Sequence, residues 1–257
     1  MRKLLVPLFA VLSLVTFWPA PARAIVGGVD ARGNEAYVAY TVSLLSEDAG
    51  GIRPSCSAVI LDEEFAVTAA HCLTAGVKGY YVGFALNRET MKRDRLRKVV
   101  GYRIPPAYNP RRFSRPNNGD LALLRFSGGL PAGYHAPKLV TDPSWLQVGV
   151  PVLIAGYGVV DGSTNLGAGT LRAAETFVAD GRYSETEVTV DQSQGKASCH
   201  GDSGGPAFLN VDGALYLMGV SSRGIGAQEC KAREGAYTSL LAYAGWLDVA
   251  RRELLGR

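Results

Sequence analysis

The chain has 257 residues, with 27 Lys and Arg against 23 Asp and Glu and a formal net charge of +4. The first 24 residues hold three basic residues and no acidic one. The rest of the chain therefore carries 24 basic and 23 acidic residues, a net charge of +1. This balance gives no argument for a nucleic-acid partner or for binding to a membrane surface. The remaining chain of about 230 residues can bury a large core, in one compact unit or in two fused barrels.

The first 24 residues have the layout of a secretory signal peptide. Arg2 and Lys3 precede an apolar run from Leu4 to Trp18, and a segment of small residues follows. The run of about 15 residues is short of the roughly 20 that a membrane-spanning helix needs, so an uncleaved anchor is the weaker interpretation. Cleavage fits after Ala22 or after Ala24. We therefore expect a secreted protein, extracellular or periplasmic, that consists of residues 25–257.

Short alternating runs broken by Gly, Pro, Asn and Asp predict an all-β sandwich or barrel. The clearest runs are Tyr40 to Leu45, Phe65 to Ala69, Leu121 to Phe126, Val150 to Ala155, Glu187 to Val190 and Leu215 to Val220. One stretch is different, because from Ser239 onward apolar residues recur at helical steps. These residues are Leu240, Tyr243, Ala244, Leu247, Ala250 and Leu254. We therefore predict a C-terminal α-helix that starts near Ser239.

Three separate motifs supply the groups that activate a serine. The segment from Cys199 to Pro206 reads CHGDSGGP and sets Ser203 among glycines, where backbone amides can surround it. The segment from Thr68 to Cys72 reads TAAHC, and the segment from Asn117 to Leu124 reads NNGDLALL. Together they offer a nucleophile, a base and a carboxylate that orients the base.

Only three histidines are candidates for the base. His71 ends an apolar run beside a cysteine, which is a rigid position. His135 fits a surface residue between two halves of the chain, and His200 lies too close to Ser203 in sequence to turn back onto it. An aspartate before an apolar strand is often only a turn former, but Asp120 lies between the histidine and serine motifs.

The order of the three residues excludes two other hydrolase classes. Gly201-x-Ser203-x-Gly205 also fits the nucleophile elbow of α/β-hydrolases, but that fold requires a histidine after the serine and none follows Ser203. A subtilisin-like order requires an aspartate before the histidine, on parallel strands and helices. The order in this chain is His71, Asp120, Ser203, which neither of these two classes has.

These motifs resemble the trypsin/chymotrypsin-like family of secreted serine proteases. The resemblance implies an all-β fold of two packed six-stranded antiparallel β-barrels with a C-terminal α-helix. The first barrel would span about residues 25–135, and the second, with the helix, about 136–257, joined across Pro131 to Pro137. His71 and Asp120 would come from the first barrel and Ser203 from the second.

The resemblance also implies roles around the nucleophile. The backbone N–H groups of Gly201 and Ser203 would form the oxyanion hole, and the free amino group of Ile25 would pair with Asp202. Because Ala24 precedes Ile25, we hypothesise that signal peptidase itself makes the active terminus, whereas cleavage after Ala22 would leave a latent enzyme. No cofactor and no metal are expected, since no Cys or His pair has zinc spacing.

Four cysteines in a secreted chain suggest two disulfides and permit three connectivities. Among these, the resemblance selects Cys56 with Cys72 and Cys199 with Cys230.

In this family the residue six positions before the nucleophile lies at the base of the specificity pocket, and here it is Ala197. An uncharged base with two wall glycines, Gly224 and Gly235, predicts cleavage after a large apolar or aromatic residue. The alternative is cleavage after Lys or Arg, if Glu229 or Glu234 enters the pocket. The remaining predicted pocket residues are Ser198, His200, Ser222 and Arg223, the last of which replaces the family's usual tryptophan; Ser222 to Gly224 would pair with the substrate backbone.

Residues 88–115 contain ten Lys or Arg against two acidic residues. A solvated loop and strand edge is the simpler interpretation, and an anionic exosite is the alternative. A non-catalytic binding protein that uses this stretch is the rival function, although such proteins usually lose a triad residue and none is missing. We expect protein or peptide substrates, with a protein inhibitor as a further candidate partner, no nucleic acid, no stable membrane anchor, and a monomer.

Overall fold

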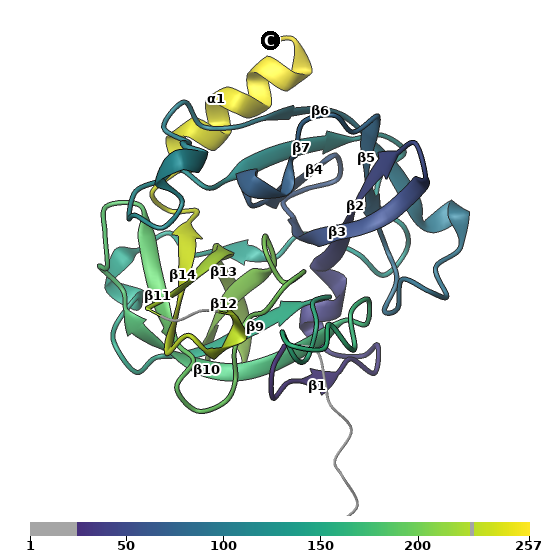
Figure 1. Cartoon of the computed structure of the whole chain (residues 1–257). Coiled ribbons are helices and arrows are strands. Elements are labelled where there is room, and N and C mark those ends of the chain that lie inside the picture. The colour runs from purple at the N-terminus through teal and green to yellow at the C-terminus, as the bar shows by residue number, and fades with distance from the viewer. Residues whose placement is uncertain (1–24, 227–228) are drawn as a thin grey trace, which may run out of the picture.

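The computed structural model describes residues 25–226 and 229–257, so the predicted signal peptide lies outside the described residues. The first six long strands close into a barrel, drawn in blue and teal in Figure 1. In ring order they are β2 (Thr41–Asp48), β3 (Gly51–Ile60), β4 (Phe65–Thr68), β7 (Ala122–Phe126), β6 (Leu96–Arg103) and β5 (Gly79–Gly83). Every neighbouring pair is antiparallel.

The next six long strands form the second barrel, because β9 pairs with both β12 and β10 and so closes the ring. Its members are β9 (Pro151–Gly156), β10 (Arg172–Asp180), β11 (Glu187–Asp191), β14 (Glu234–Ser239), β13 (Ala214–Ile225) and β12 (Pro206–Val211). Two short strands lie outside the rings: β1 (Val29–Asp30) pairs with β10, and β8 (Lys138–Leu139) runs parallel to β13. The predicted fold of two six-stranded barrels is confirmed.

Short 3₁₀ turns connect the strands at six places. They are η1 (Ala36–Ala39), η2 (Ala70–Cys72), η3 (Arg93–Arg95), η4 (Pro110–Arg112), η5 (Pro143–Trp145) and η6 (Glu229–Lys231). Each of the six alternating runs in the sequence overlaps an observed strand.

The C-terminal helix α1 (Ala244–Leu255) starts later than the sequence predicts. Ser239 is still the last residue of β14, where it pairs with Gly219. Leu240 and Tyr243 follow the helical spacing but lie in the turns before the helix, with both side chains buried in the core between the barrels. Burial of these two residues, and not helical structure, explains the first part of the apolar pattern.

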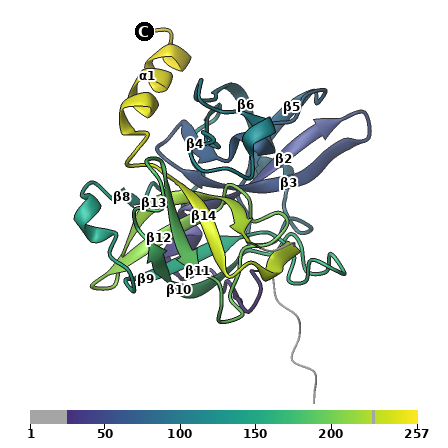
Figure 2. The same cartoon turned by 60° about the vertical axis from the view of Figure 1, so that its left-hand side comes forward.

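Helix α1 follows the second barrel and packs on the first, as Figure 2 shows. The side chain of Arg125 in β7 donates a hydrogen bond to the backbone oxygen of Leu254 at 2.9 Å, and Arg103 in β6 pairs with Glu253. The helix therefore ties the two barrels together on the side away from β1. No helix in the described part of the chain has both the length and the apolar character needed to cross a membrane.

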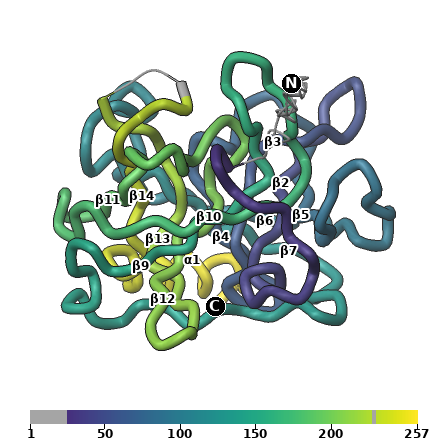
Figure 3. Tube along the Cα trace, turned by 90° about the horizontal axis from the view of Figure 1, so that it is seen from below, coloured from purple at the N-terminus to yellow at the C-terminus, as the bar shows by residue number. Residues whose placement is uncertain are grey.

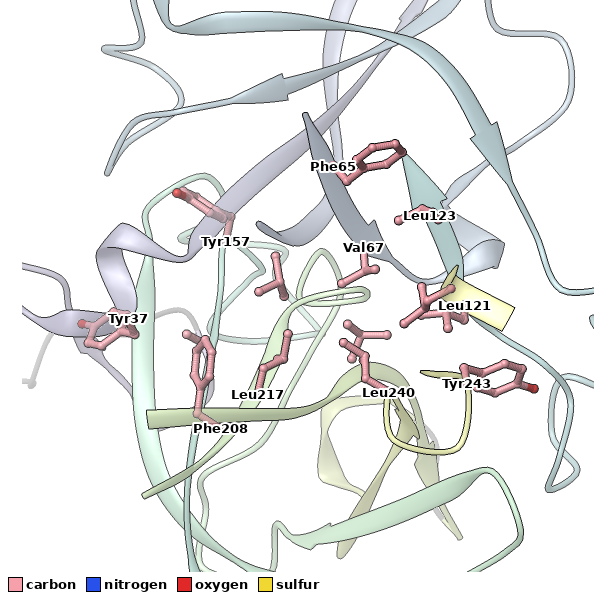
Figure 4. Packing of buried hydrophobic residues seen from close by; sticks show 14 of the residues in the cluster. Tyr37, Phe65, Val67, Leu121, Leu123, Tyr157, Phe208, Leu217, Leu240 and Tyr243 are labelled. Carbon is pink, nitrogen blue, oxygen red and sulfur yellow. The ribbon is translucent and has the colours of Figure 1, made fainter. Parts of the chain in front are cut away.

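The largest apolar cluster lies between the barrels (Figure 4). Phe65, Val67 and Leu123 reach it from the first barrel, and Phe208 and Leu217 reach it from the second. Burial of this much apolar surface fixes one barrel against the other. A cleft between the barrels therefore has rigid walls.

The first described residues attach to the second barrel. Val26 exchanges backbone hydrogen bonds with Ala197, N to O at 2.9 Å and O to N at 3.1 Å, and β1 pairs with β10. Asp30 and Arg172 form an ion pair beside this strand. In Figure 3 this segment, in purple, begins beside β10. The residues just after the predicted cleavage site are therefore anchored to the second barrel at Ala197, six residues before Ser203 in the sequence.

Candidate active site

Strand pairing brings His71 and Asp120 together although they are far apart in sequence. Strand β4 pairs with β7 so that Thr68 lies opposite Ala122. His71 follows the end of β4 in the turn η2, and Asp120 precedes the start of β7, so both lie at the same edge of the barrel. The Nδ1 atom of His71 lies 2.8 Å from Oδ2 of Asp120, and the backbone N–H of His71 donates to Oδ1 at 2.9 Å.

The carboxylate of Asp120 is fully buried and held by further hydrogen bonds. The hydroxyl of Ser222 donates to Oδ2 at 2.6 Å, and this residue comes from β13 of the other barrel. Asn118 accepts the backbone N–H of Asp120 at 3.0 Å, while Thr238 donates to its backbone oxygen at 2.9 Å. The contacts from His71 and Ser222 satisfy the buried carboxylate and fix its orientation, while the other two hold the backbone of Asp120.

Phe113 packs edge-on against the His71 ring, with ring centroids 5.1 Å apart. It belongs to the loop after η4, which is closed by a hydrogen bond from the side chain of Asn118 to the backbone oxygen of Phe113 at 2.9 Å. The imidazole therefore has a carboxylate on one side and an aromatic wall on another.

Ser203 lies in a turn that three bonds from outside the turn hold in place. The N–H of Ser57 donates to the oxygen of Ser203 at 2.9 Å, and the hydroxyl of Ser57 donates to the oxygen of Gly201 at 2.8 Å. The N–H of Val159 donates to the oxygen of His200 at 2.8 Å. In a trans peptide the C=O and N–H groups point in opposite directions, so this last bond directs the N–H of Gly201 away from Val159.

Gly201 has a φ of +92°, a conformation that costs a residue with a side chain appreciable strain. The turn thus depends on this glycine.

His71 and Ser203 both line one cleft of about 370 Å³. The walls come from both barrels, and among the side chains that the structure describes no carboxylate lines the cleft. The full lining is His71, Phe113, Ser198, Cys199, His200, Ser203, Ser221, Ser222, Arg223, Gly224, Cys230 and Ala232.

Asp202 points away from this cleft into the protein. Its carboxylate accepts the N–H of Gly158 at 2.8 Å and that of Cys199 at 2.9 Å. Burial raises the pKa of Asp202 to about 7, although these two hydrogen bonds and the positive charges of Arg88 and Arg172 act in the opposite direction. Ile25 is buried as well, in the apolar core of the second barrel.

The predicted pocket residues separate into two groups. Ser198 lines the cleft, whereas Ala197 is buried and lines a neighbouring hollow together with Val26. Gly235 pairs with Gly224 across β14 and β13 but is not in the cleft lining. Glu234 lies at the start of β14, also outside that lining, and the side chain of Glu229 lies outside what the structure describes.

Arg223 forms a buried, two-point ion pair with Glu187, a residue of β11. The Nη1 atom lies 2.5 Å from Oε1 and the Nη2 atom 3.0 Å from Oε2. The side chains are 6% and 1% exposed. The backbone N–H of Asn117, three residues before Asp120, also donates to Glu187, at 3.2 Å. This pair therefore links the wall of the cleft to the loop that carries Asp120.

Both disulfides form as the resemblance implies, Cys56 with Cys72 and Cys199 with Cys230. The first fixes the turn that carries His71, and the second fixes the chain just before the nucleophile turn. The sulfur atoms of the first lie close to a nitrogen of His71, but two thiols joined in a disulfide are not thiolate ligands for a metal.

Most of the basic stretch is solvated, but three of its arginines contact other parts of the chain. Arg88 turns inward over the ring of Tyr157, Arg97 donates to the backbone oxygen of Gly129 at 2.8 Å, and Arg103 pairs with Glu253. Seven further basic residues in this stretch are exposed or partly exposed: Lys92, Arg93, Arg95, Lys98, Arg111, Arg112 and Arg115.

Sequence reasoning missed Ser57, Phe113 and Glu187, which contact the site as described above. It also missed Gln192, whose side-chain amide donates to the hydroxyl of the cleft residue Ser198 at 2.9 Å. None belongs to a recognisable motif. Phe113 is the only aromatic residue between Arg111 and Arg115, which is a weak signal for a loop with an apolar contact. The other three act through contacts with residues that lie far along the chain.

Comparison with known proteins gives a consistent result. The family model described as Trypsin matches residues 25–247. The chain is 27% identical over 237 residues to trypsin-3 of Salmo salar, covering 87% of this chain and 91% of that protein. It is 26% identical over 226 residues to CLIP domain-containing serine protease B4 of Anopheles gambiae, covering 75% of this chain and 61% of that protein. The chain thus spans about three fifths of the length of this second relative.

Proposed function

This chain belongs to the trypsin family and is a serine endopeptidase, and from that premise we propose that Ser203, His71 and Asp120 are its catalytic triad. The observation that carries the proposal is the 2.8 Å contact between His71 and Asp120, in the same cleft that Ser203 lines. The carboxylate accepts a hydrogen bond from Nδ1–H of the imidazole, which leaves Nε2 as the atom able to accept a proton from a serine.

The reaction is acyl transfer. The Ser203 oxygen attacks the carbonyl carbon of the scissile bond while its proton passes to His71. The N–H groups of Gly201 and Ser203 stabilise the negative oxygen of the tetrahedral intermediate. His71 then gives its proton to the leaving amine, the C–N bond breaks, and an acyl-enzyme forms. Water, activated by His71, releases the acid and restores Ser203.

We propose that the free amino group of Ile25 activates the enzyme by pairing with Asp202. Support comes from the buried, electrostatically unfavourable carboxylate of Asp202 and from the anchoring of Val26 on Ala197. A positive charge near Asp202 would lower its pKa and keep it ionised. Secretion and removal of residues 1–24 belong to the same proposal, with signal peptidase cleaving after Ala24 so that Ile25 becomes the first residue.

The substrate preference has a charge component and a size component. Ser198, Gly224 and Ala232, which line the cleft, are uncharged, and no carboxylate of the described side chains joins them, so we propose cleavage after an uncharged residue and not after Lys or Arg. The sequence predicts a large apolar or aromatic residue there because two wall glycines would leave the pocket open. The amide of Gln192 occupies the space beside Gly235, which argues against a large residue at this position.

Digestion of a mixed peptide library by the secreted protein tests the function, with Ser203→Ala as the matched control. We expect cuts that disappear in the variant. Cuts that persist in Ser203→Ala would overturn the triad. An absence of cuts would also overturn it, if the intact mass shows that the protein begins at Ile25. An intact mass that corresponds to a chain starting at Arg23 would instead overturn the hypothesis that signal peptidase makes the active terminus.

Proteins or peptides are the substrates that the family implies. A non-catalytic binding role for residues 88–115 is not favoured, because all three triad residues are present and three of the ten basic residues make internal contacts. We propose a monomer without a membrane anchor.

A further inference from the structure

The space beside Gly235 is filled by Gln192. A Cβ atom built on Gly235 would collide with the amide nitrogen of Gln192 and would lie 3.0 Å from its Cδ. Gln192 directly follows β11, whose Val190 pairs with Gly235. The glycine is therefore needed to make room for a side chain of this chain, and it leaves no opening for a side chain of the substrate.

The amide of Gln192 is fixed in this position. The residue is 4% exposed, its Nε2 donates to the hydroxyl of Ser198 at 2.9 Å, and its backbone N–H donates to the oxygen of Arg233 at 2.7 Å. Ser198 lines the cleft that also contains Ser203. The amide therefore closes the cleft behind Ser198.

Ala232 narrows the cleft beside Gly224. A Cβ atom on Gly224 would lie 2.7 Å from the methyl carbon of Ala232, so this methyl group occupies the space next to the second wall glycine. Cys230, two residues before it, is held by the disulfide to Cys199. Both Cys230 and Ala232 line the cleft and also the hollow behind it.

Ala197 and Gln192 both line that second hollow, and neither is in the lining of the cleft. The two hollows are thus separated by a partition in which Gln192 and Ala232 take part. A substrate side chain that enters from Ser203 meets this partition before it can reach Ala197.

We propose that Gln192 determines the primary specificity of this enzyme and restricts the residue before the scissile bond to a small uncharged side chain, that of Gly, Ala or Ser. The inference rests on the proposed function, since it concerns the pocket of the same nucleophile. A Phe or Leu side chain would have to displace the amide, break its bond to Ser198 and expose a buried polar group. In a pocket of fixed size, a misfit of one methylene group already changes kcat/KM by about 10- to 200-fold.

The test compares Gln192→Ala with Gln194→Ala. Gln194 lies two residues away on the same loop but is exposed, so it controls for loss of a glutamine from this loop. The two variants and the unchanged protein, each secreted from the full chain, are assayed on peptides that differ only in having Ala, Leu or Phe before the scissile bond. A small sulfonyl fluoride, which reacts with an activated serine without filling a deep pocket, measures the fraction of folded, active protein.

We expect the unchanged protein and Gln194→Ala to cleave after Ala at least about tenfold better than after Phe, in kcat/KM. In Gln192→Ala the ratio should shift toward Leu or Phe by about tenfold or more, at an unchanged fraction of labelled serine. A preference for Phe or Leu in the unchanged protein, or a ratio that Gln192→Ala leaves the same, would overturn the inference while the proposed function stands. Absence of labelling at Ser203 in the unchanged protein would overturn the proposed function, and the inference with it.

Discussion

The hydroxyl of Ser57 donates a hydrogen bond to the backbone oxygen of Gly201 at 2.8 Å and accepts the N–H of Tyr157 at 3.0 Å. One side chain of the first barrel thus holds the peptide that follows Gly201 in the second barrel. Because the backbone N–H of Ser57 also donates to the oxygen of Ser203, Ser57 makes two hydrogen bonds to the turn that carries Ser203.

Ser57→Ala should lower kcat about tenfold and leave KM nearly unchanged. Loss of a donor to a buried carbonyl costs about 1–3 kcal/mol, and about 1.4 kcal/mol in the barrier corresponds to a factor of ten. Steady-state kinetics on one peptide substrate measure the effect, and Ser57→Thr, which keeps the hydroxyl, should restore most of the activity.

Ser43→Ala is the matched control, because its buried hydroxyl donates to the oxygen of Gly83 at 3.2 Å inside the first barrel and does not contact the turn. It should cost stability without a selective loss of kcat. Equal kinetic effects of the two substitutions would contradict a positioning role for Ser57.

Asp120→Asn should lower kcat by about 10⁴-fold; this magnitude comes from serine proteases of the same family and not from this structure. Ser222→Ala should have a smaller effect, about 10- to 100-fold, since a hydrogen bond to a charged group contributes about 1.5–3 kcal/mol. Thr238→Val is the comparison, because Thr238 binds the backbone oxygen of Asp120 and not its carboxylate. If Thr238→Val lowers kcat as much as Ser222→Ala does, the carboxylate contact is not what matters.

Glu187→Gln should lower the free energy of unfolding by about 3–5 kcal/mol, because it leaves the guanidinium of Arg223 buried without a counter-charge. Replacing both residues by methionine should recover much of this loss, since a buried pair and a well-packed apolar pair are often close in energy. Urea unfolding of Ser203→Ala protein, which cannot digest itself, measures both effects.

The exposed pair of Arg103 and Glu253 is the control for an ion pair in solvent. Glu253→Gln should cost no more than about 1 kcal/mol. A loss at Glu187 no larger than this would mean that water or another group compensates Arg223.

The pH dependence of stability should differ between the unprocessed and the processed chain. With Ile25 still in a peptide bond, burial raises the pKa of Asp202 from 3.8 to about 7, so the folded protein holds the proton more tightly than the unfolded chain does. Its contribution to the free energy of unfolding therefore falls as the pH rises from about 4 to 7. If the amino group of Ile25 then pairs with Asp202, the pKa falls below the ordinary value, and the stability from the pair is instead lost toward acid pH.

Thermal unfolding of Ser203→Ala protein between pH 4 and 8 tests this, with chains that begin at Ile25 or at Arg23. The two chains should differ in slope over this range, and Asp202→Asn should remove the difference because the amide does not titrate. Identical slopes for the two chains would speak against the pairing of Ile25 with Asp202.

The sequence by itself determined the class of fold, the family and the three motifs that bear the reactive groups. Alternating apolar runs predict strands because side chains in a strand alternate between two faces, and this pattern can be read from neighbouring residues alone. The order of His71, Asp120 and Ser203 was enough to reject two other hydrolase classes. The predicted start of the helix near Ser239 was wrong, because the helix begins at Ala244. Leu240 and Tyr243 are apolar because they are buried between the barrels, and their spacing resembles that of a helix face.

Only the tertiary structure decided what surrounds these groups. Whether Gly235 leaves a pocket open depends on Gln192, and whether Arg223 is a free cation depends on Glu187; in each case the partner comes from another strand or loop. Ser57 reaches the nucleophile turn from the other barrel altogether. Spacing along a chain reports which way a side chain faces within its own element, but free space and counter-charges are set by elements that meet only when the barrels close and pack.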